Sequence, residues 1–284
     1  MSTIALVADS GCDLPRELLD RYRIEIVPLI TRFGTQELPD LPETRAQFWQ
    51  RYNLDEPAQT SAPSVGAWAE AFAAALSRAE QVLAITITGK HSSTYNSACI
   101  AAREFAGRVH VFDSWSLSLG EGLLVLRAAQ AIAEGLALDA ILEELHALRA
   151  RLRVIFFLDT LDAVQRGGRL APVMTAIKRM SSLLSIKPIL TIREGVIGLE
   201  GAVRSRNKGV RRILDELQGK SIEAVAVAHT RLPSMAERLA DAASEITYIP
   251  RSRLLIAEAG PAFAVHAGPG AFGLAYVPVV SDNR

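Results

Sequence analysis

Hydroxyl side chains gather just after a short apolar run in the first half of the chain. The run Val82 to Thr88 breaks at Gly89, and a predicted helix then opens with three hydroxyls, at Ser92, Ser93 and Thr94. Free backbone N–H groups and the helix dipole attract anions to a helix N-terminus. A serine or threonine hydroxyl adds a directed hydrogen-bond donor. These residue types in this place predict a site for a carboxylate or a phosphate.

A second hydroxyl cluster, Thr60, Ser61 and Ser64, precedes another predicted helix, Val65 to Leu76. Ser64 directly before that helix is a good N-cap. The simpler interpretation of both clusters is therefore that they only cap helices. Two clusters at such junctions of one predicted sheet keep the anion site open as the alternative.

Three further polar side chains lie at or near glycine turns or in a basic cluster. His266 stands before Gly268, at the end of a predicted strand, Phe263 to His266, and Arg169 follows two glycines. Arg204 begins a basic cluster before a predicted helix. A guanidinium at a flexible turn suits a carboxylate, a phosphate or a structural salt bridge. Gly268 opens a formal G-x-G-x-x-G, but no helix and no acidic residue about 20 positions later follow it in this sequence, so a dinucleotide fingerprint is not predicted.

Known catalytic templates are missing from the sequence. It has no G-x-S-x-G, no Walker loop, no H-E-x-x-H and no C-x-x-C, and its five histidines show no metal-ligand spacing. We therefore predict no catalytic residues, no metal site and no cofactor. A serine-type acyl hydrolase that uses Ser92 and His266 stays open as an alternative function, as does a phosphate-binding regulatory module.

The elements that position these side chains alternate between strands and helices in the first half. Apolar runs such as Ile4 to Ala8 and Val109 to Phe112 alternate with helical patterns of ten or more residues. This predicts an α/β domain over residues 1–152, with a mostly parallel, doubly wound sheet and helices on both faces. We expect no antiparallel pairing in this half.

The second half, residues 153–284, shows a different pattern of strands and turns. Ile186 to Ile192 and Val196 to Val203 flank Glu194-Gly195, the clearest hairpin signal in the chain. The predicted closing strands are Arg253 to Glu258, Phe263 to His266 and Phe272 to Val277. We therefore predict a second α/β domain with a mixed or antiparallel sheet.

Composition limits the classes of partner. Lys plus Arg and Asp plus Glu each number 31, and this balance argues against a broad surface for nucleic acid or for more than transient membrane contact. Cys12 and Cys99 form no disulfide framework. The sequence shows no signal-peptide pattern and no apolar run of about 18 residues, so we expect a cytoplasmic protein.

Taken together, the segments resemble the DegV family of bacterial fatty-acid-binding proteins. The family's D-S-x-x-D-L, T-S-x-P-S, S-G-T-Y-x-S-A and D-S-x-x-x-S-x-G-x-G boxes occur here in order, with further matches in the second half. The matching residues are Asp9, Ser10, Asp13 and Leu14; Thr60, Ser61, Pro63 and Ser64; Ser92, Thr94, Tyr95, Ser97 and Ala98; Asp113, Ser114, Ser118, Gly120 and Gly122; Gly167 to Arg169; Ile186 to Pro188; Arg204; and His266 with Gly268 to Gly270.

The resemblance implies a carrier protein, not an enzyme, with a long-chain fatty acid in a tunnel between the two domains. It implies that Thr60, Ser61, Ser92 and His266 bind the carboxylate. The headgroup vicinity would comprise His91, Ser93, Arg169, Arg204 and Gly268. Some family members present the fatty acid to a separate fatty-acid kinase, which is therefore a further expected partner.

Two departures from the family pattern affect this site. His91 and Ser93 stand where the family usually has leucine and glycine beside the serine of its S-G-T-Y box. Ser205 and Arg206 replace the usual small residue and glycine after Arg204. The first departure alters the expected headgroup geometry, and the second affects the expected docking of a kinase.

Overall fold

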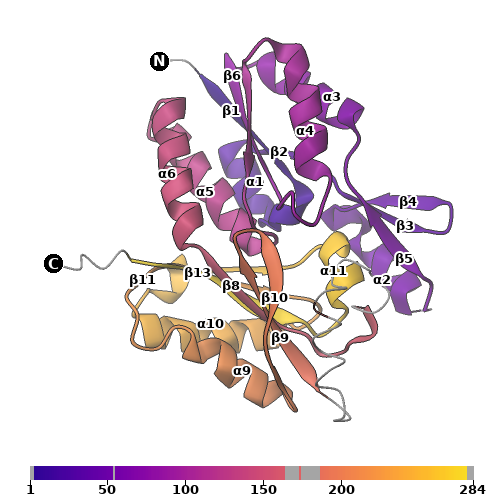
Figure 1. Cartoon of the computed structure of the whole chain (residues 1–284), viewed down its shortest axis with the longest axis vertical. Helices are drawn as coiled ribbons and strands as arrows, with labels where there is room; N and C mark the ends of the chain where they lie inside the picture. The colour runs from indigo at the N-terminus through magenta and orange to yellow at the C-terminus, as the bar shows by residue number, and fades with distance from the viewer. Residues whose placement is uncertain (1–2, 54, 164–172, 174–185, 280–284) are drawn as a thin grey trace. The chain divides into compact units, whose positions relative to one another are not determined.

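The computed structural model divides the chain into two compact units (Figure 1), each described below by itself. The first unit comprises Met1–Ala150 and Gly260–Ala262, and the second comprises Arg151–Ala259 and Phe263–Arg284. The structure describes residues 3–53, 55–163, 173 and 186–279.

A four-stranded parallel sheet organises the first unit. Its order is β2-β1-β6-β7, and every neighbouring pair is parallel. The strands are β1 (Ile4–Asp9), β2 (Glu25–Val27), β6 (Gln81–Thr86) and β7 (Val109–Asp113). Such strands read as nearly continuous apolar runs because both faces of the sheet are covered. The predicted parallel α/β architecture is confirmed.

Helices cover both faces of this sheet, with α3 and α4 on one side and α5 and α6 on the other (Figure 1). The helices are α1 (Arg16–Tyr22), α3 (Val65–Leu76), α4 (Thr94–Ala102), α5 (Leu119–Ala133) and α6 (Leu138–Arg151), with short 3₁₀ turns η1 (Ser10–Cys12) and η3 (Arg103–Phe105). Trp68 and Phe72 of α3 pack against Val7 and Val82 of the sheet. Leu83, which alternates with Val82 along β6, is equally buried.

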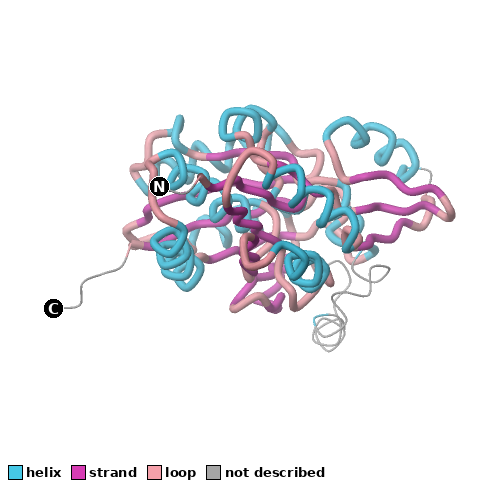
Figure 2. The backbone as a smooth tube through the Cα atoms, turned by 90° about the horizontal axis from the view of Figure 1, so that it is seen from above, coloured by secondary structure: helices cyan, strands magenta, loops and turns pink. Residues whose placement is uncertain are grey.

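A three-stranded antiparallel sheet in the first unit corrects the expectation that this half lacks antiparallel pairing (Figures 1 and 2). Its strands, in the order β4-β3-β5, are β3 (Ile30–Phe33), β4 (Gln36–Pro39) and β5 (Ala58–Ser61), and η2 (Pro42–Thr44) and α2 (Arg45–Asn53) separate β4 from β5. Gly34 turns between β3 and β4 at a φ of +57°. Phe33 is buried and its ring lies 5.6 Å from that of Phe48 on α2. The short, mostly polar strands β4 and β5 carry no clear alternation, which is why their pairing escaped the sequence analysis.

A six-stranded mixed sheet organises the second unit, in the order β10-β9-β8-β13-β11-β12. The strands are β8 (Arg153–Phe157), β9 (Lys187–Arg193), β10 (Val196–Val203), β11 (Ile222–His229), β12 (Leu255–Glu258) and β13 (Phe272–Pro278). The helices are α9 (Arg206–Asp215), α10 (Pro233–Thr247) and α11 (Pro261–Ala267), with the short 3₁₀ turn η4 (Arg251–Arg253). Only β11 and β12 pair in parallel; the other neighbours are antiparallel. The predicted β9–β10 hairpin and the mixed sheet are confirmed.

The predicted strand Phe263 to His266 is wrong, because these residues belong to helix α11. Pro261 begins this helix, and Gly268 follows it with a φ of +73° and donates its N–H to the carbonyl of Ala264. Proline at the start and a left-handed glycine after the end are the usual helix boundaries. Most side chains of α11 are buried, so the segment has no polar face to reveal a helical period.

Within the described residues, no helix is long and apolar enough to cross a membrane.

Candidate functional site

Ser92 lies in the loop between β6 and α4, at the edge of the sheet where the parallel strands end. Its Oγ accepts the N–H of Thr94 at 3.2 Å and lies 2.7 Å from the Thr94 Oγ1, where either oxygen can donate. Thr94 is fully buried, whereas Ser92 is partly exposed. Ser92 therefore caps the start of α4 and keeps hydrogen-bonding capacity on its accessible side.

Two carboxylates from the neighbouring strands hold this loop. Asp9, at the end of β1, accepts the N–H groups of Ile87 and Gly11, each at 2.8 Å. Asp113, at the end of β7, accepts the Gly89 N–H at 3.2 Å and the Trp115 N–H at 3.0 Å. The loop that carries Ser92 is thus fixed from both sides of β6.

Burial affects the charge of both carboxyl groups. Asp9 is fully buried, and desolvation raises its pKa to about 7 against the opposing hydrogen bonds from Ile87 and Gly11. Burial also raises the pKa of Asp113, although the Trp115 and Gly89 N–H groups favour its charged form. These two residues were matched to the family boxes, but their contacts with the loop could not be inferred from the sequence.

Thr60 and Ser61 lie at the end of β5, where they pair with Thr31 and Ile30 of β3. Both side chains are partly buried. Ser64 begins α3 and accepts the N–H of Ala67 at 3.1 Å. The N-cap prediction is confirmed for Ser64, which is exposed.

The residues beside Ser92 differ in exposure. His91 is partly buried and donates its backbone N–H to the carbonyl of Thr88, at 3.4 Å. Ser93 is exposed, and its carbonyl accepts the Ser97 N–H of the first helical turn at 2.9 Å. The Ser93 side chain makes no cap hydrogen bond with the described part of α4. Of the two candidate caps, Ser92 is therefore the one whose side chain bonds to the helix.

The other predicted site residues lie in the second unit or outside the described residues. His266 lies in the last turn of α11, partly buried, and Gly268 follows it. Arg204 is exposed between β10 and α9. Arg169, with Gly167 and Gly168, lies outside the residues that the structure describes.

Asp159 is a centre of charge in the second unit that the sequence analysis missed. Its carboxylate lies 2.8 Å from the Lys187 Nζ and 2.6 Å from the Arg206 guanidinium. Burial raises the pKa of Asp159, but these two cations outweigh burial and hold it below its usual value. A Cβ on Gly270 would lie 3.0 Å from the Asp159 Cβ, so the Gly-Pro-Gly turn packs against this cluster.

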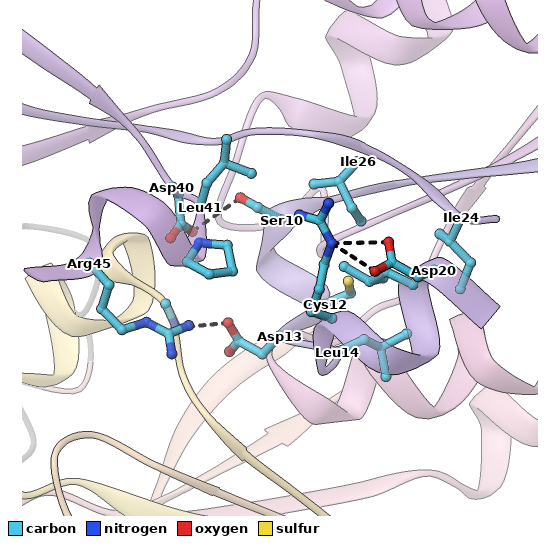
Figure 3. Close-up of a pocket in the computed structure, with 14 residues that line it drawn as sticks. Ser10, Cys12, Asp13, Leu14, Asp20, Ile24, Ile26, Asp40, Leu41 and Arg45 are labelled. Atoms are coloured by element: carbon cyan, nitrogen blue, oxygen red, sulfur yellow. Dashed lines mark hydrogen bonds and ion pairs between the residues drawn. The ribbon is translucent and has the colours of Figure 1, made fainter. Parts of the chain in front are cut away.

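A cavity of about 280 Å³ lies beside η1 and α1 in the first unit (Figure 3). Ser10 donates to the Asp40 carboxyl group at 3.1 Å, and the Gly260 N–H donates to Asp13 at 2.8 Å. Figure 3 shows the Arg45 guanidinium pointing towards Asp13. Burial, followed by the charge of Asp13, raises the pKa of Asp40 to about 8 against the opposing Ser10 hydrogen bond. The Asp40 carboxyl group therefore holds its proton to a higher pH than an ordinary aspartate.

The described residues contain no group of three or more His, Cys, Asp or Glu side chains placed to hold a metal ion.

Comparisons with known proteins identify relatives along almost the whole chain. A family model described as "Uncharacterised protein, DegV family" matches residues 3–279. A DegV domain-containing protein of Deinococcus radiodurans is 33% identical over 286 residues, which cover 98% of this chain and 99% of that protein. One from Caldanaerobacter subterraneus is 32% identical, with 96% and 98% covered.

Solved structures share the same architecture. A DegV family protein from Thermus thermophilus, described for fatty acid binding, matches with a TM-score of 0.87 and 34% identity over 98% of this chain and 100% of that one. A stearic acid-binding protein from Eubacterium ventriosum matches with a TM-score of 0.86 and 28% identity, with 97% and 98% covered. The chain therefore belongs to the DegV family.

Proposed function

We propose that this protein binds a long-chain fatty acid and that hydroxyls of Thr60, Ser61 and Ser92 hold the carboxylate. The observation that carries the proposal is the placement of Ser92 at the start of α4, with its Oγ accepting from Thr94. The Thermus thermophilus relative, which is described for fatty acid binding, supports the ligand class.

The chemistry of Ser92 suits a carboxylate. When the Thr94 hydroxyl donates across the 2.7 Å contact, Ser92 accepts from both Thr94 groups and its own O–H remains to donate. The dipole of α4 favours a negative charge at the same place. A hydrogen bond to a charged group contributes about 1.5 to 3 kcal/mol.

Most of the affinity would come from the acyl chain, since burial of each CH₂ group contributes about 0.8 kcal/mol before ordering costs. The hydroxyls then supply orientation. His266 remains a proposed carboxylate ligand, and Arg204, Gly268, Arg169, His91 and Ser93 remain proposed neighbours of the headgroup. The tunnel, the fatty-acid kinase as a partner, the cytoplasmic location and the absence of a cofactor likewise stay predictions.

A displacement titration tests the role of Ser92. The delipidated protein would be loaded with a fluorescent fatty acid, which is then displaced by oleate or by methyl oleate. Ser92→Ala should weaken oleate binding by about 0.5 to 3 kcal/mol, which is roughly twofold to a hundredfold. Ser64→Ala is the matched control, because the Ser64 hydroxyl accepts a hydrogen bond from the Ala67 N–H of α3. Equal affinities of wild type and Ser92→Ala would remove Ser92 from the site.

The same preparation separates the alternative functions. Turnover of a chromogenic ester that Ser92→Ala and His266→Ala each abolish would indicate the acyl hydrolase instead. Displacement by phosphorylated metabolites but not by oleate would indicate a phosphate-binding module.

A further inference from the structure

A second cavity in the first unit, of about 320 Å³, opens at the edge where the parallel strands begin. Ile4 and Leu6 of β1, with Ala129 and Ile132 of α5, give it an apolar lining. Ile4 is the first residue of β1, whereas Ser92 follows the end of β6, which is parallel to β1. This cavity therefore lies at the opposite edge of the sheet from the proposed carboxylate site.

Three arginines line the cavity, Arg21, Arg23 and Arg78, and no carboxylate does. Arg78 is paired with Glu25 at 3.0 Å. The Arg21 guanidinium lies 5.3 Å from the ring centre of Tyr22. Over the described parts of the chain, neither Arg21 nor Arg23 forms an ion pair, so both guanidinium groups keep N–H donors for a ligand.

Several backbone carbonyls at the end of α1 already accept hydrogen bonds. Arg23 has a φ of +52° and donates its N–H to the carbonyls of Asp20 and Leu19, and the Leu19 carbonyl also accepts from Ile24. The Arg23 carbonyl accepts from Arg78 at 3.5 Å. The carbonyls that would otherwise attract cations at a helix C-terminus are therefore already bonded.

We propose that this cavity binds a small anionic amphiphile, whose phosphate or carboxylate group contacts Arg21 and Arg23 while its apolar part lies on Ile4 and Ile132, which are partly exposed. Guanidinium groups bind phosphate and carboxylate through paired N–H donors. The volume is near the lower end of small-molecule sites. It suits one headgroup with a short apolar segment, and not a complete long acyl chain. This proposal is independent of the proposed fatty-acid function.

A titration with hexyl phosphate, followed by NMR chemical shifts of the full chain, tests the proposal. Wild type should bind hexyl phosphate saturably, and Arg21→Ala/Arg23→Ala should lower the affinity at least about tenfold, because it removes two charged donors. The matched control is Arg103→Ala/Arg108→Ala, which removes two charges from exposed positions of the same unit and should leave the affinity unchanged. Thermal unfolding of both variants checks that they are folded.

Further measurements test whether binding requires the anionic group and whether that group belongs to a lipid or to a soluble molecule. Hexanol in place of hexyl phosphate should bind far more weakly. Co-sedimentation with phosphatidylcholine vesicles, with and without phosphatidylglycerol, shows whether a lipid headgroup is captured. Sedimentation that requires phosphatidylglycerol and both arginines identifies a lipid, and binding of hexyl phosphate alone identifies a soluble ligand. The proposal is overturned if neither binds, if hexanol binds equally well, or if both double variants lose affinity to the same extent.

Discussion

Replacement of Asp113 by asparagine should loosen the loop that carries Ser92. The Asp113 carboxylate accepts the Gly89 N–H with both oxygens at 3.2 Å and the Trp115 N–H with Oδ1 at 3.0 Å. Asparagine keeps one acceptor oxygen but places an NH₂ group where the second oxygen was. With the amide oxygen at the Oδ1 position, both N–H groups keep an acceptor, but this acceptor is neutral and the Gly89 N–H also faces the NH₂ group.

The size of the effect follows from the loss of the charged acceptor. A hydrogen bond to a charged group contributes about 1.5 to 3 kcal/mol when buried, and Asp113 is partly exposed, so we expect about 1 to 2 kcal/mol. If the ordered loop is the form that binds fatty acid, Asp113→Asn weakens binding by up to roughly thirtyfold, since about 1.4 kcal/mol corresponds to tenfold.

Amide hydrogen exchange and fatty-acid titration together provide the assay. Asp113→Asn should speed exchange in residues 87–93 and lower fatty-acid affinity, with exchange in β1 and β6 unchanged. Asp139→Asn makes the same chemical change at an exposed position of α6 and should alter neither. Unchanged exchange in the loop of Asp113→Asn would refute the role given to this carboxylate. Faster exchange with unchanged affinity would show that binding does not need the ordered loop.

Four further changes have expected outcomes for stability. The pKa of Asp40 is raised from 3.8 to about 8, so its contribution to stability is fully present below pH 3.8 and is lost as the pH rises from there towards 8. Asp40→Asn should therefore raise the melting temperature at pH 9 relative to wild type, with little change at about pH 3. Gly209→Ala should destabilise by about 1 to 3 kcal/mol, because the new Cβ would lie 2.4 Å from the Phe157 ring. Gly66→Ala, which meets only the Ser64 Oγ at 3.8 Å, should stabilise by up to about 1 kcal/mol in the same thermal melts. Ser64→Ala should cost about 0.5 to 2 kcal/mol through the lost cap and leave fatty-acid affinity unchanged.

The sequence predicted correctly those strands and helices whose apolar pattern matches their burial in the folded protein. The buried runs of β1 and β6 are strands, and the apolar spacing of α3 marks a helix with Ser64 as its cap. The strand prediction for the α11 segment was wrong because the alternation of Phe263 and Val265 resembles that of a strand. The helix is buried on nearly all sides, so its apolar residues show no helical period. Proline and glycine at its ends carried the correct signal.

The positions of the candidate residues in strands, loops and helices were partly predictable, and the contacts that fix them were less so. Ser92 stands at a strand-to-helix junction, as its spacing indicated. The contacts of Asp9 and Asp113 with its loop depend on strand order, which places β1 and β7 on either side of β6. Asp159 meets Lys187 and Arg206 from 28 and 47 positions away. No local pattern in the sequence reports such long-range pairs.

Native mass spectrometry of the purified full chain tests whether the protein binds a long-chain fatty acid. The spectrum should show the protein with an added mass equal to that of one long-chain fatty acid, and the same adduct should form when delipidated protein is incubated with oleate. Organic extraction of the sample should release that fatty acid unchanged. Absence of the adduct both before and after incubation with oleate would show that the protein does not bind a long-chain fatty acid.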